Sequence, residues 1–484
     1  AETLEAEGMV LLENNGVLPL AKDSKVSVFS VSSVNMVYGG TGSGSVDTST
    51  VPDLKTALEA SGLSVNTTLW DFYKQKSADG YTRSAPNWKG GQFSINEVPW
   101  ADVESAAGSS FADYGDAAIV VISRSGGEGS DLTAVNFAET EGVEGNSGNY
   151  LELSTEEADM LAAVNEQFDN VVVLINANNA LELGWLADYE NIKAALWIGG
   201  VGQTGLYAVA DALVGDVVPS GRLVDTYAYD ASSAPAAQNA GSNFWINNGF
   251  SNESDQYIVY AEGIYVGYRY YETRYEDVVM GTGNAGDYDY ASTVLYPFGY
   301  GLSYTQFQYS DFSMAENDDS FTVSVTVTNT GDTYTGKEVV QVYFQSPYTQ
   351  YDIENGVEKA SVELCGFAKT DALAPGESQT VQIEVPKEQL KAYDYRTAKT
   401  FILDAGDYYS TVGTDAHDAM NNILAAKGYT VADGMTADGD ASMTAKWTNA
   451  SLDATTYAVD SVTGTAVTNL FGYADISSYD AYSD

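Results

Sequence analysis

The chain of 484 residues contains a single cysteine, Cys365, and a single histidine, His417. One cysteine cannot form an internal disulfide, and so few of these residues leave little room for zinc sites or histidine-based triads. We interpret both residues as incidental and predict no metal site. Any chemistry in this chain must therefore rest on carboxylates.

Basic residues are also scarce, since Lys plus Arg number 21 against 68 Asp plus Glu, a formal net charge of −47. A polyanion of this strength repels phosphate backbones and anionic lipid, which excludes nucleic acid and membrane surfaces as expected partners. No run of 18 apolar residues is present and the first residues lack a basic-then-apolar signal pattern, so we expect the chain as given to be soluble. With 44% hydrophobic residues it has enough material for packed cores.

The first half alternates short apolar runs with helical periodicity, the pattern of an α/β domain with a largely parallel sheet and helices on both faces. A capping box at Ser154–Glu157 predicts the start of one helix, and Gly215 the end of another. We assign this domain to residues 1–225. The predicted central strands, too continuously apolar to have a solvated face, are Val26–Val31, Ala117–Ile122, Val171–Ile175 and Ile192–Trp197.

The second half has a different pattern. Residues 226–300 are rich in Tyr, Asn and Gly without clear periodicity, and we interpret them as an ordered connector. Alternation with period two then predicts an all-β sandwich over residues 301–416. Residues 417–484 are weakly patterned and are interpreted as an extension or linker. The clearest predicted strands of the sandwich are Phe321–Val327, Val339–Tyr343 and Val381–Val385.

The loop after the second predicted strand carries the most informative candidate, Glu128, between Gly127 and Gly129. Ligands of open α/β sheets gather at the carboxyl ends of strands. A glutamic acid whose pKa is raised by partial burial or a nearby carboxylate can protonate a leaving-group oxygen. The alternative is a solvated turn carboxylate. Asp131 is a possible second carboxylate or a loop-stabilising residue, and Arg124 is a possible ion-pair partner of either.

A second loop, Gly39–Gly44, follows the first predicted strand. It lacks the Lys-Ser/Thr of a P-loop and the spacing of a dinucleotide fingerprint, so its small residues favour approach of a polar ligand to backbone amides and to Ser43 instead. A plain structural turn is the alternative. The Tyr-rich segment Tyr265–Tyr271 could stack on sugar rings, but we favour domain packing.

Six blocks in this order resemble glycoside hydrolase family 3 of the β-glucosidase type, and the sandwich after them resembles the fibronectin-III-like domain of that family. The resemblance covers residues 1–416. The blocks are Glu7–Leu20, Gly39–Gly44, Ser125–Asp131, Val218–Leu223, Glu262–Tyr271 and Pro297–Thr305.

The resemblance implies that a (β/α)8 barrel supplies an aspartate nucleophile and that Glu128 is the acid/base. It also implies that Ser43 contacts the sugar in the first subsite and that no cofactor takes part. Ser130 and Leu132 depart from the family pattern around the acid/base.

No barrel sequence and no Ser-Asp-Trp nucleophile motif of the family occur in these residues. Retaining hydrolysis needs two carboxyl groups about 5 Å apart across the glycosidic bond, so we expect this chain alone to be inert. Either a barrel precedes Ala1 or the barrel follows the sandwich in a permuted member. We favour permutation, because Val467–Ile476 resembles the segment that leads into the barrel in permuted members.

The expected activity is that of a retaining exo-acting β-glucosidase or β-xylosidase, with a β-glycoside as substrate and the barrel as partner. Two other classes remain open: a non-catalytic carbohydrate-binding or scaffold protein of the same fold, and a nucleotide-binding α/β protein. The acidity and low Lys content favour an extracellular or cell-surface location, and homo-oligomerisation is possible.

Overall fold

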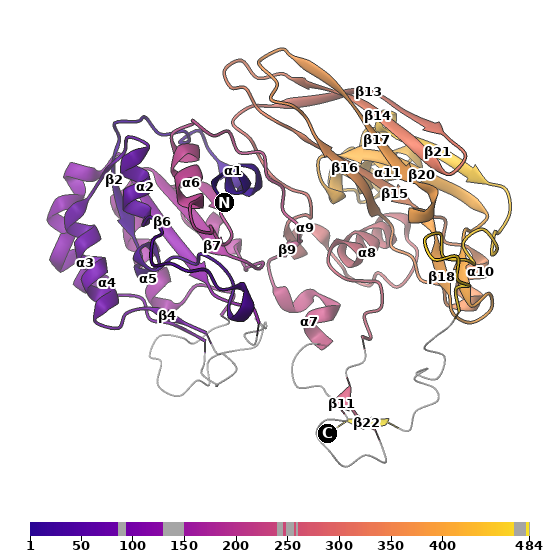
Figure 1. Cartoon of the computed structure of the whole chain (residues 1–484), viewed down its shortest axis with the longest axis horizontal. Helices are drawn as coiled ribbons and strands as arrows, with labels where there is room; N and C mark the ends of the chain where they lie inside the picture. Colours follow the sequence, from indigo (N-terminus) through magenta and orange to yellow (C-terminus); the bar gives the residue numbers. More distant parts are fainter. Residues whose placement is uncertain are drawn as a thin grey trace.

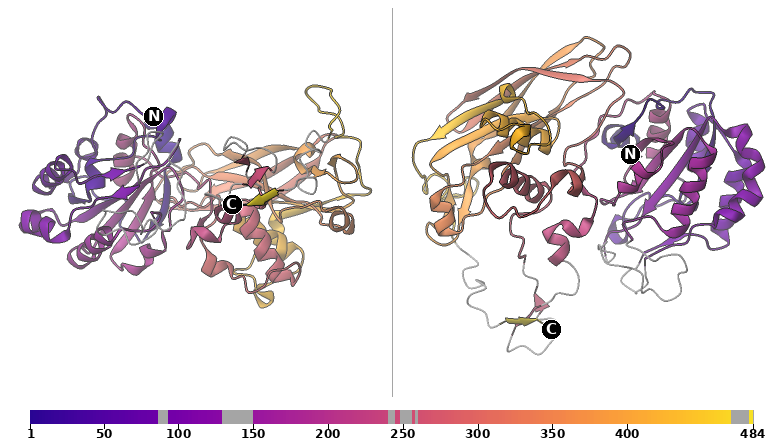
Figure 2. Two further views of the ribbon diagram at one scale, coloured as in Figure 1. Left: turned by 90° about the horizontal axis from the view of Figure 1, so that it is seen from below. Right: turned by 180° about the vertical axis from the view of Figure 1, so that it is seen from behind.

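The computed structural model describes residues 1–85, 93–128, 150–239, 245–247, 256–257, 260–468 and 481–483. It shows an α/β domain and a β-rich domain, joined by helical segments (Figure 1). Turning the molecule keeps these two bodies side by side (Figure 2). Within the described residues no helix has the length and apolar character needed to cross a membrane.

The α/β domain contains a six-stranded sheet, parallel except for one edge strand, which confirms the predicted α/β architecture. The exception, β1, pairs antiparallel with β8 and lies in a segment for which we predicted no strand. All four predicted strands are present, and all eight residues of β6 are buried. The strand order is β1 (Val10–Asn14), β8 (Ile192–Trp197), β7 (Val171–Ala177), β6 (Ala117–Arg124), β2 (Lys25–Phe29) and β3 (Ser64–Val65).

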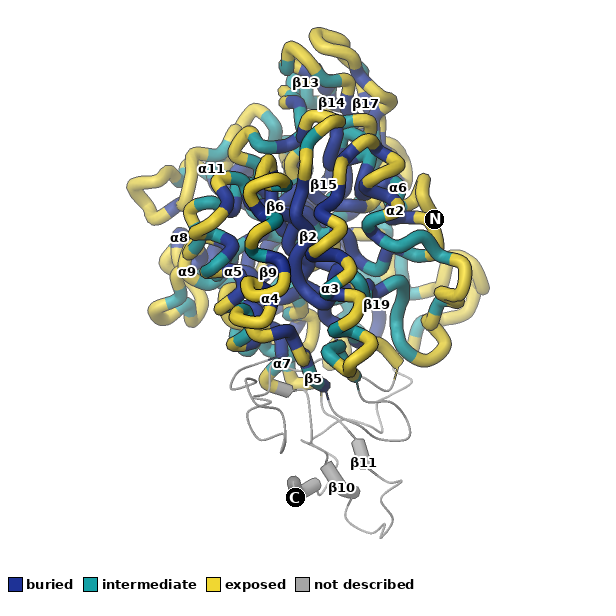
Figure 3. Tube along the Cα trace, turned by 90° about the vertical axis from the view of Figure 1, so that its left-hand side faces the viewer, coloured by how far each residue is buried: buried dark blue, intermediate teal, exposed yellow. Residues whose placement is uncertain are grey.

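Helices cover both faces of this sheet, as the continuously apolar strands require. The strands therefore form the buried centre of the domain (Figure 3). One core lies under α3 (Thr67–Ala78), α4 (Trp100–Ala107) and α5 (Thr155–Gln167). The other lies mainly under α2 (Leu54–Ala60) and α6 (Gly205–Leu213), with α1 (Glu2–Gly8) packed against α6.

The predicted capping box starts α5. The Ser154 hydroxyl accepts the N–H of Glu157 at 3.2 Å, and the Ser154 N–H donates to the Glu157 carboxylate at 2.9 Å. Gly215 lies just beyond α6 with φ +84°, a backbone conformation that glycine adopts without steric cost.

The connector contains a helix that the sequence analysis missed, α8 (Tyr268–Met280). Tyr271, Tyr275 and Val279, spaced by four residues, bury one face of α8 against α11 (Ala416–Ala426). Tyrosine has only modest helix propensity, so tertiary packing overrides the weak local signal here. The tyrosines of this segment take part in packing, as predicted. Around α8 lie α7 (Pro235–Asn239), α9 (Tyr290–Thr293), β9 (Tyr227–Ala228) and β12 (Val294–Tyr296).

The second domain is the predicted β-sandwich, with a core that includes Phe321, Val342, Tyr408 and Val412. β21 and α11 extend this domain beyond residue 416, since β21 pairs with β20. One sheet has the order β13 (Phe307–Glu316), β14 (Ser320–Asn329) and β17 (Ser378–Pro386). The other has the order β16 (Glu363–Lys369), β15 (Val339–Gln345), β20 (Gly406–Gly413) and β21 (Thr444–Asn449). The shorter elements at its edge are α10 (Gln350–Asn355), β18 (Ala392–Asp394) and β19 (Thr400–Ile402).

Ion pairs and close backbone contacts join the two domains. Arg222 of the α/β domain lies 2.7 Å from Glu338 of the sandwich, and both side chains are at least nine-tenths buried. Gly221 and Gly301 allow three backbone segments to meet. A Cβ on Gly221 would lie 2.3 Å from the Met9 carbonyl oxygen, and one on Gly301 2.4 Å from that of Gly221.

Candidate functional site

Glu128 and Ser43 lie in loops that follow two adjacent parallel strands, β6 and β2. Ser43 belongs to a short 3-10 turn, Gly42–Gly44. The two loops contact each other directly, because the Thr41 hydroxyl donates to the Glu128 carbonyl oxygen at 3.0 Å. The structure thus brings together the two residues that the sequence analysis selected.

The Glu128 carboxylate accepts the Ser43 backbone N–H at 2.7 Å. The hydroxyl and the backbone N–H of Ser43 both lower the pKa of Glu128. This direction is opposite to the raised pKa expected of a general acid. Desolvation raises the pKa of Glu128 less than the Ser43 hydrogen bonds lower it, because the side chain is exposed, and within the described residues no neighbouring carboxylate raises its pKa. Glu128 is therefore ionised in the chain as it stands.

Two glycines make this contact possible. Gly42 has φ +60°, and a Cβ there would lie 2.5 Å from Oε2 of Glu128. Gly127 has φ +143°, and a Cβ there would lie 2.8 Å from the backbone nitrogen of Thr41. Side chains at either position would separate the loops, so the glycine-rich composition is required by their close approach.

Arg124 does not pair with Glu128, contrary to one possibility raised by the sequence. It is fully buried and forms an ion pair with Glu157 at 2.8 Å. Its Nε also donates to the Tyr150 carbonyl oxygen at 2.6 Å. Arg124 therefore joins the end of β6 to the start of α5. Asp131, Ser130 and Leu132 lie outside the described residues.

The sequence analysis did not identify Arg83 as part of this region. Arg83 lies in β4 (Arg83–Ser84), which pairs with β5 (Ser94–Ile95), and its Nε donates to the Ser125 hydroxyl at 2.7 Å. A two-residue strand has no recognisable period, so only the rarity of basic residues in this chain could have drawn attention to Arg83.

The single histidine and the single cysteine lie in packed surroundings away from these loops. His417 stacks on Tyr290 with ring centroids 3.7 Å apart, and its Nδ1 lies 2.9 Å from Glu272. Burial raises the pKa of Cys365 to about 12, so its thiol is unreactive at neutral pH. Among the residues that the structure describes, no group of His, Cys, Asp and Glu could hold a metal ion.

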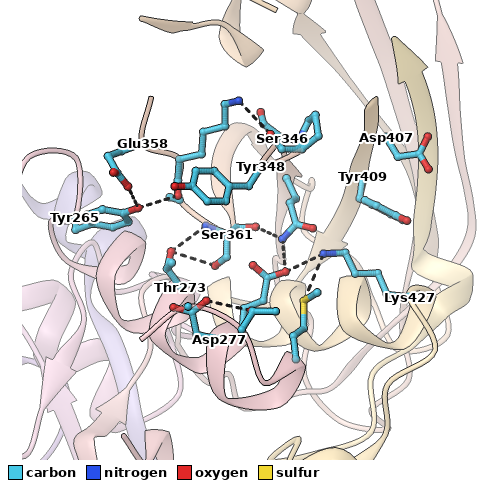
Figure 4. Close-up of a pocket in the computed structure, with 18 residues that line it drawn as sticks. Tyr265, Thr273, Asp277, Ser346, Tyr348, Glu358, Ser361, Asp407, Tyr409 and Lys427 are labelled. Atoms are coloured by element: carbon cyan, nitrogen blue, oxygen red, sulfur yellow. Dashed lines mark hydrogen bonds and ion pairs between the residues drawn. The ribbon is translucent and has the colours of Figure 1, made fainter. Parts of the chain in front are cut away.

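A separate cavity of about 440 Å³ lies between α8 and the sandwich (Figure 4). Its polar groups largely bind each other. Glu276 accepts hydrogen bonds from Gln345 and Lys427, both at 2.8 Å, and Tyr265 donates to Glu358 at 2.7 Å. These internal bonds indicate a structural junction, and we keep the loops after β2 and β6 as the candidate site.

Comparison with known families agrees with this architecture. Residues 9–268 match the Glycosyl hydrolase family 3 C-terminal domain, and residues 338–416 match a fibronectin type III-like domain. The first match spans more than half of the chain, so the chain belongs to glycoside hydrolase family 3.

Several relatives carry β-glucosidase names. The chain is 34% identical over 426 residues to a beta-glucosidase from Ruminococcus albus, covering 87% of this chain and 39% of that protein. It is 34% identical over 452 residues to Beta-glucosidase A from Butyrivibrio fibrisolvens, covering 85% of this chain and 49% of that protein. The chain thus spans less than half the length of these two relatives.

Solved structures show the same fold. Beta-glucosidase 3B from Thermotoga neapolitana, in complex with alpha-D-glucose, superposes with a TM-score of 0.70 at 27% identity, covering 93% of this chain and 54% of that one. A beta-glucosidase from Paenibacillus barengoltzii gives a TM-score of 0.68 at 32% identity, covering 86% of this chain and 41% of that one.

Proposed function

We propose that this chain is the acid/base-supplying part of a retaining, exo-acting β-glycosidase of the β-glucosidase or β-xylosidase type. Its substrate is a terminal, non-reducing β-linked sugar. The observation that carries the proposal is the position of Glu128, which projects from a glycine-flanked loop beside Ser43 at the carboxyl edge of a family 3 sheet.

In this mechanism Glu128 protonates the departing aglycone oxygen while an aspartate forms the covalent glycosyl-enzyme. Glu128 then removes a proton from the water that releases the sugar. Ser43 orients Glu128 through its N–H and contacts the sugar with its hydroxyl. A (β/α)8 barrel supplies the aspartate, so the described chain by itself hydrolyses no glycoside.

The lowered pKa of Glu128 is consistent with an active site that is complete only when the barrel is present. A general acid needs its proton at working pH, and an exposed carboxylate that accepts hydrogen bonds does not keep one. Docking of a barrel over the loop excludes water and brings a second carboxylate near Glu128. Both changes raise a carboxyl pKa. The acid role therefore depends on the assembled active site.

The test is Glu128→Ala in the complete enzyme, assayed with aryl β-glucosides and with cellobiose. Loss of general-acid help should lower kcat/KM on cellobiose by roughly 10²–10⁴-fold, with a much smaller loss on an activated dinitrophenyl glucoside. Added azide should restore turnover and yield the β-glucosyl azide. Glu104→Ala, an exposed carboxylate change on α4, is the control. An equal loss on both substrates would remove Glu128 from the acid role.

The exposure of Glu128 also favours a second candidate, a non-catalytic sugar-binding protein of the same fold, because an ionised carboxylate accepts hydrogen bonds from sugar hydroxyls. Calorimetry with glucose and xylose, beside turnover assays on the complete protein, separates the two functions. Sugar binding without turnover would support the second.

A further inference from the structure

The described part of the loop that presents Glu128, residues 125–128, contains two consecutive glycines. Gly126 and Gly127 separate Ser125 from Glu128, and glycine has the greatest backbone freedom. One anchor lies on the β2 side, where Thr41 donates to Gly126 through its N–H at 3.4 Å and to Glu128 through its hydroxyl at 3.0 Å. The position of Ser125 must be fixed from another direction.

The β4–β5 hairpin supplies that second anchor. Arg83 of β4 donates from Nε to the Ser125 hydroxyl at 2.7 Å. Phe93 and Ile95, from the other arm, form a small apolar cluster with Tyr150, whose ring lies 4.7 Å from that of Phe93. The Tyr150 hydroxyl in turn accepts the Ser125 backbone N–H at 3.3 Å. Ser125 is thus held by both its side chain and its backbone.

The environment of Arg83 is costly for a cation. Burial lowers the pKa of Arg83 to about 10, and its Nη1 is buried with no hydrogen-bond partner among the residues that the structure describes. Within the described residues no carboxylate lies within ion-pair distance of Arg83. Arg124, by contrast, is fully buried and forms an ion pair with Glu157. A largely desolvated cation with no paired carboxylate among the described residues is a poor source of stability, and groups with strongly shifted pKa values concentrate at functional sites.

We propose that Arg83 is a positioning residue for the acid/base: through Ser125 it fixes the exit of β6 so that Glu128 meets the glycosidic oxygen. The inference rests on the proposed function of Glu128. Arg83 does not touch the reacting atoms. Arginine suits this role because Nε lies in the rigid plane of the guanidinium and is attached directly to the aliphatic part of the side chain. The direction of its hydrogen bond to Ser125 is therefore better fixed than that of a lysine ammonium, which rotates freely.

The test compares Arg83→Met, Arg83→Lys and Ser125→Ala in the complete enzyme. The constant kcat/KM reports the first step, in which the leaving group of cellobiose needs a proton and dinitrophenolate does not. For Arg83→Met, kcat/KM on cellobiose should therefore fall roughly 10–100-fold, with less than a threefold change in kcat/KM on the dinitrophenyl glucoside. Ser125→Ala should reproduce the same selectivity, and Arg83→Lys should recover only part of the loss. The double variant should be no slower than the worse single variant, because both remove one contact.

Arg274→Met is the matched control, since Arg274 donates to the Ala285 carbonyl oxygen beside α8, away from the Glu128 loop. Equal losses on both substrates, or none on cellobiose, would overturn the inference. If Arg83→Met does not fold, Arg83→Lys and Ser125→Ala decide the question by the same criterion. Glu128→Ala separates the two proposals: if it lacks the acid signature, the proposed function fails. If Glu128→Ala does lose more activity on cellobiose than on the dinitrophenyl glucoside, but the Arg83 and Ser125 variants do not, only the positioning role fails.

Discussion

At the scale of single residues, the site depends on two glycines, which have no side chain. Gly42 and Gly127 let the loops after β2 and β6 approach until the Ser43 N–H reaches Glu128. The sequence predicted that both loops lie at one edge of the sheet, because they follow parallel strands. It left open whether Glu128 is an acid with a raised pKa or a solvated turn carboxylate, since side-chain exposure and the Ser43 hydrogen bonds are tertiary properties.

Gly42→Ala tests this close approach. The new Cβ would lie 2.5 Å from the Glu128 carboxylate at a residue with φ +60°, so the loops must separate. We expect a stability loss of only about 1 kcal/mol but at least a tenfold loss of kcat on cellobiose in the complete enzyme. Gly44→Ala is the control, because no atom of the described part of the chain lies within 4 Å of a Cβ at this position. Equal activity of the two variants would contradict this account.

At the scale of elements, long apolar strands and a capping box were predictable, whereas α8 and β1 were not. The predicted strands carry their own signal, since every residue of β6 and β7 is buried. α8 owes its stability to Tyr271 and Tyr275 packing on α11, more than one hundred residues away in the chain. No local window of sequence contains that contact. Arg83 was missed for the same reason, because only the tertiary fold brings β4 to Ser125.

The start of α5 offers a prediction at this scale. Glu157 serves both the capping box and the ion pair with Arg124, whereas Ser154 serves only the cap. Ser154→Ala should cost about 1 kcal/mol in the free energy of unfolding. Glu157→Ala should cost roughly 3–5 kcal/mol, because it leaves a buried cation unpaired. Urea unfolding of both variants measures the difference, and similar costs would show that the ion pair contributes little.

At the scale of the whole molecule, buried acids set the pH dependence of stability. Burial raises the pKa of Glu97 to about 7 and that of Asp415 to about 7. Burial alone lowers the pKa of His417, but the Glu272 carboxylate raises it above its usual value. Groups with a raised folded pKa bind protons more tightly in the folded state, so their contribution is present at low pH and is lost as pH rises through 7.

The free energy of unfolding should therefore fall between pH 5 and pH 8. Asp415→Asn should reduce this fall by on the order of 2 kcal/mol, since asparagine also caps helices and keeps the acceptor for the Asp418 N–H. Hydrogen bonds from Thr456 hold the pKa of Asp453 at about 2, so Asp453→Asn should leave the slope in this range unchanged. A wild-type stability independent of pH over this interval would refute the assignment. Denaturant unfolding curves at pH 5 and pH 8 measure the change in the free energy of unfolding.

The backbone junction of Met9, Gly221 and Gly301 has a practical meaning for protein engineering. Because even one added carbon atom at either glycine meets a carbonyl oxygen, the segment around Gly301 is structurally part of the α/β domain. The Tyr304 hydroxyl, bonded to the Ala212 carbonyl oxygen at 2.8 Å, extends this attachment. A chimaera that exchanges the sandwich for another accessory module should accordingly be joined after Tyr304, so that the backbone junction and the Tyr304 hydrogen bond are kept.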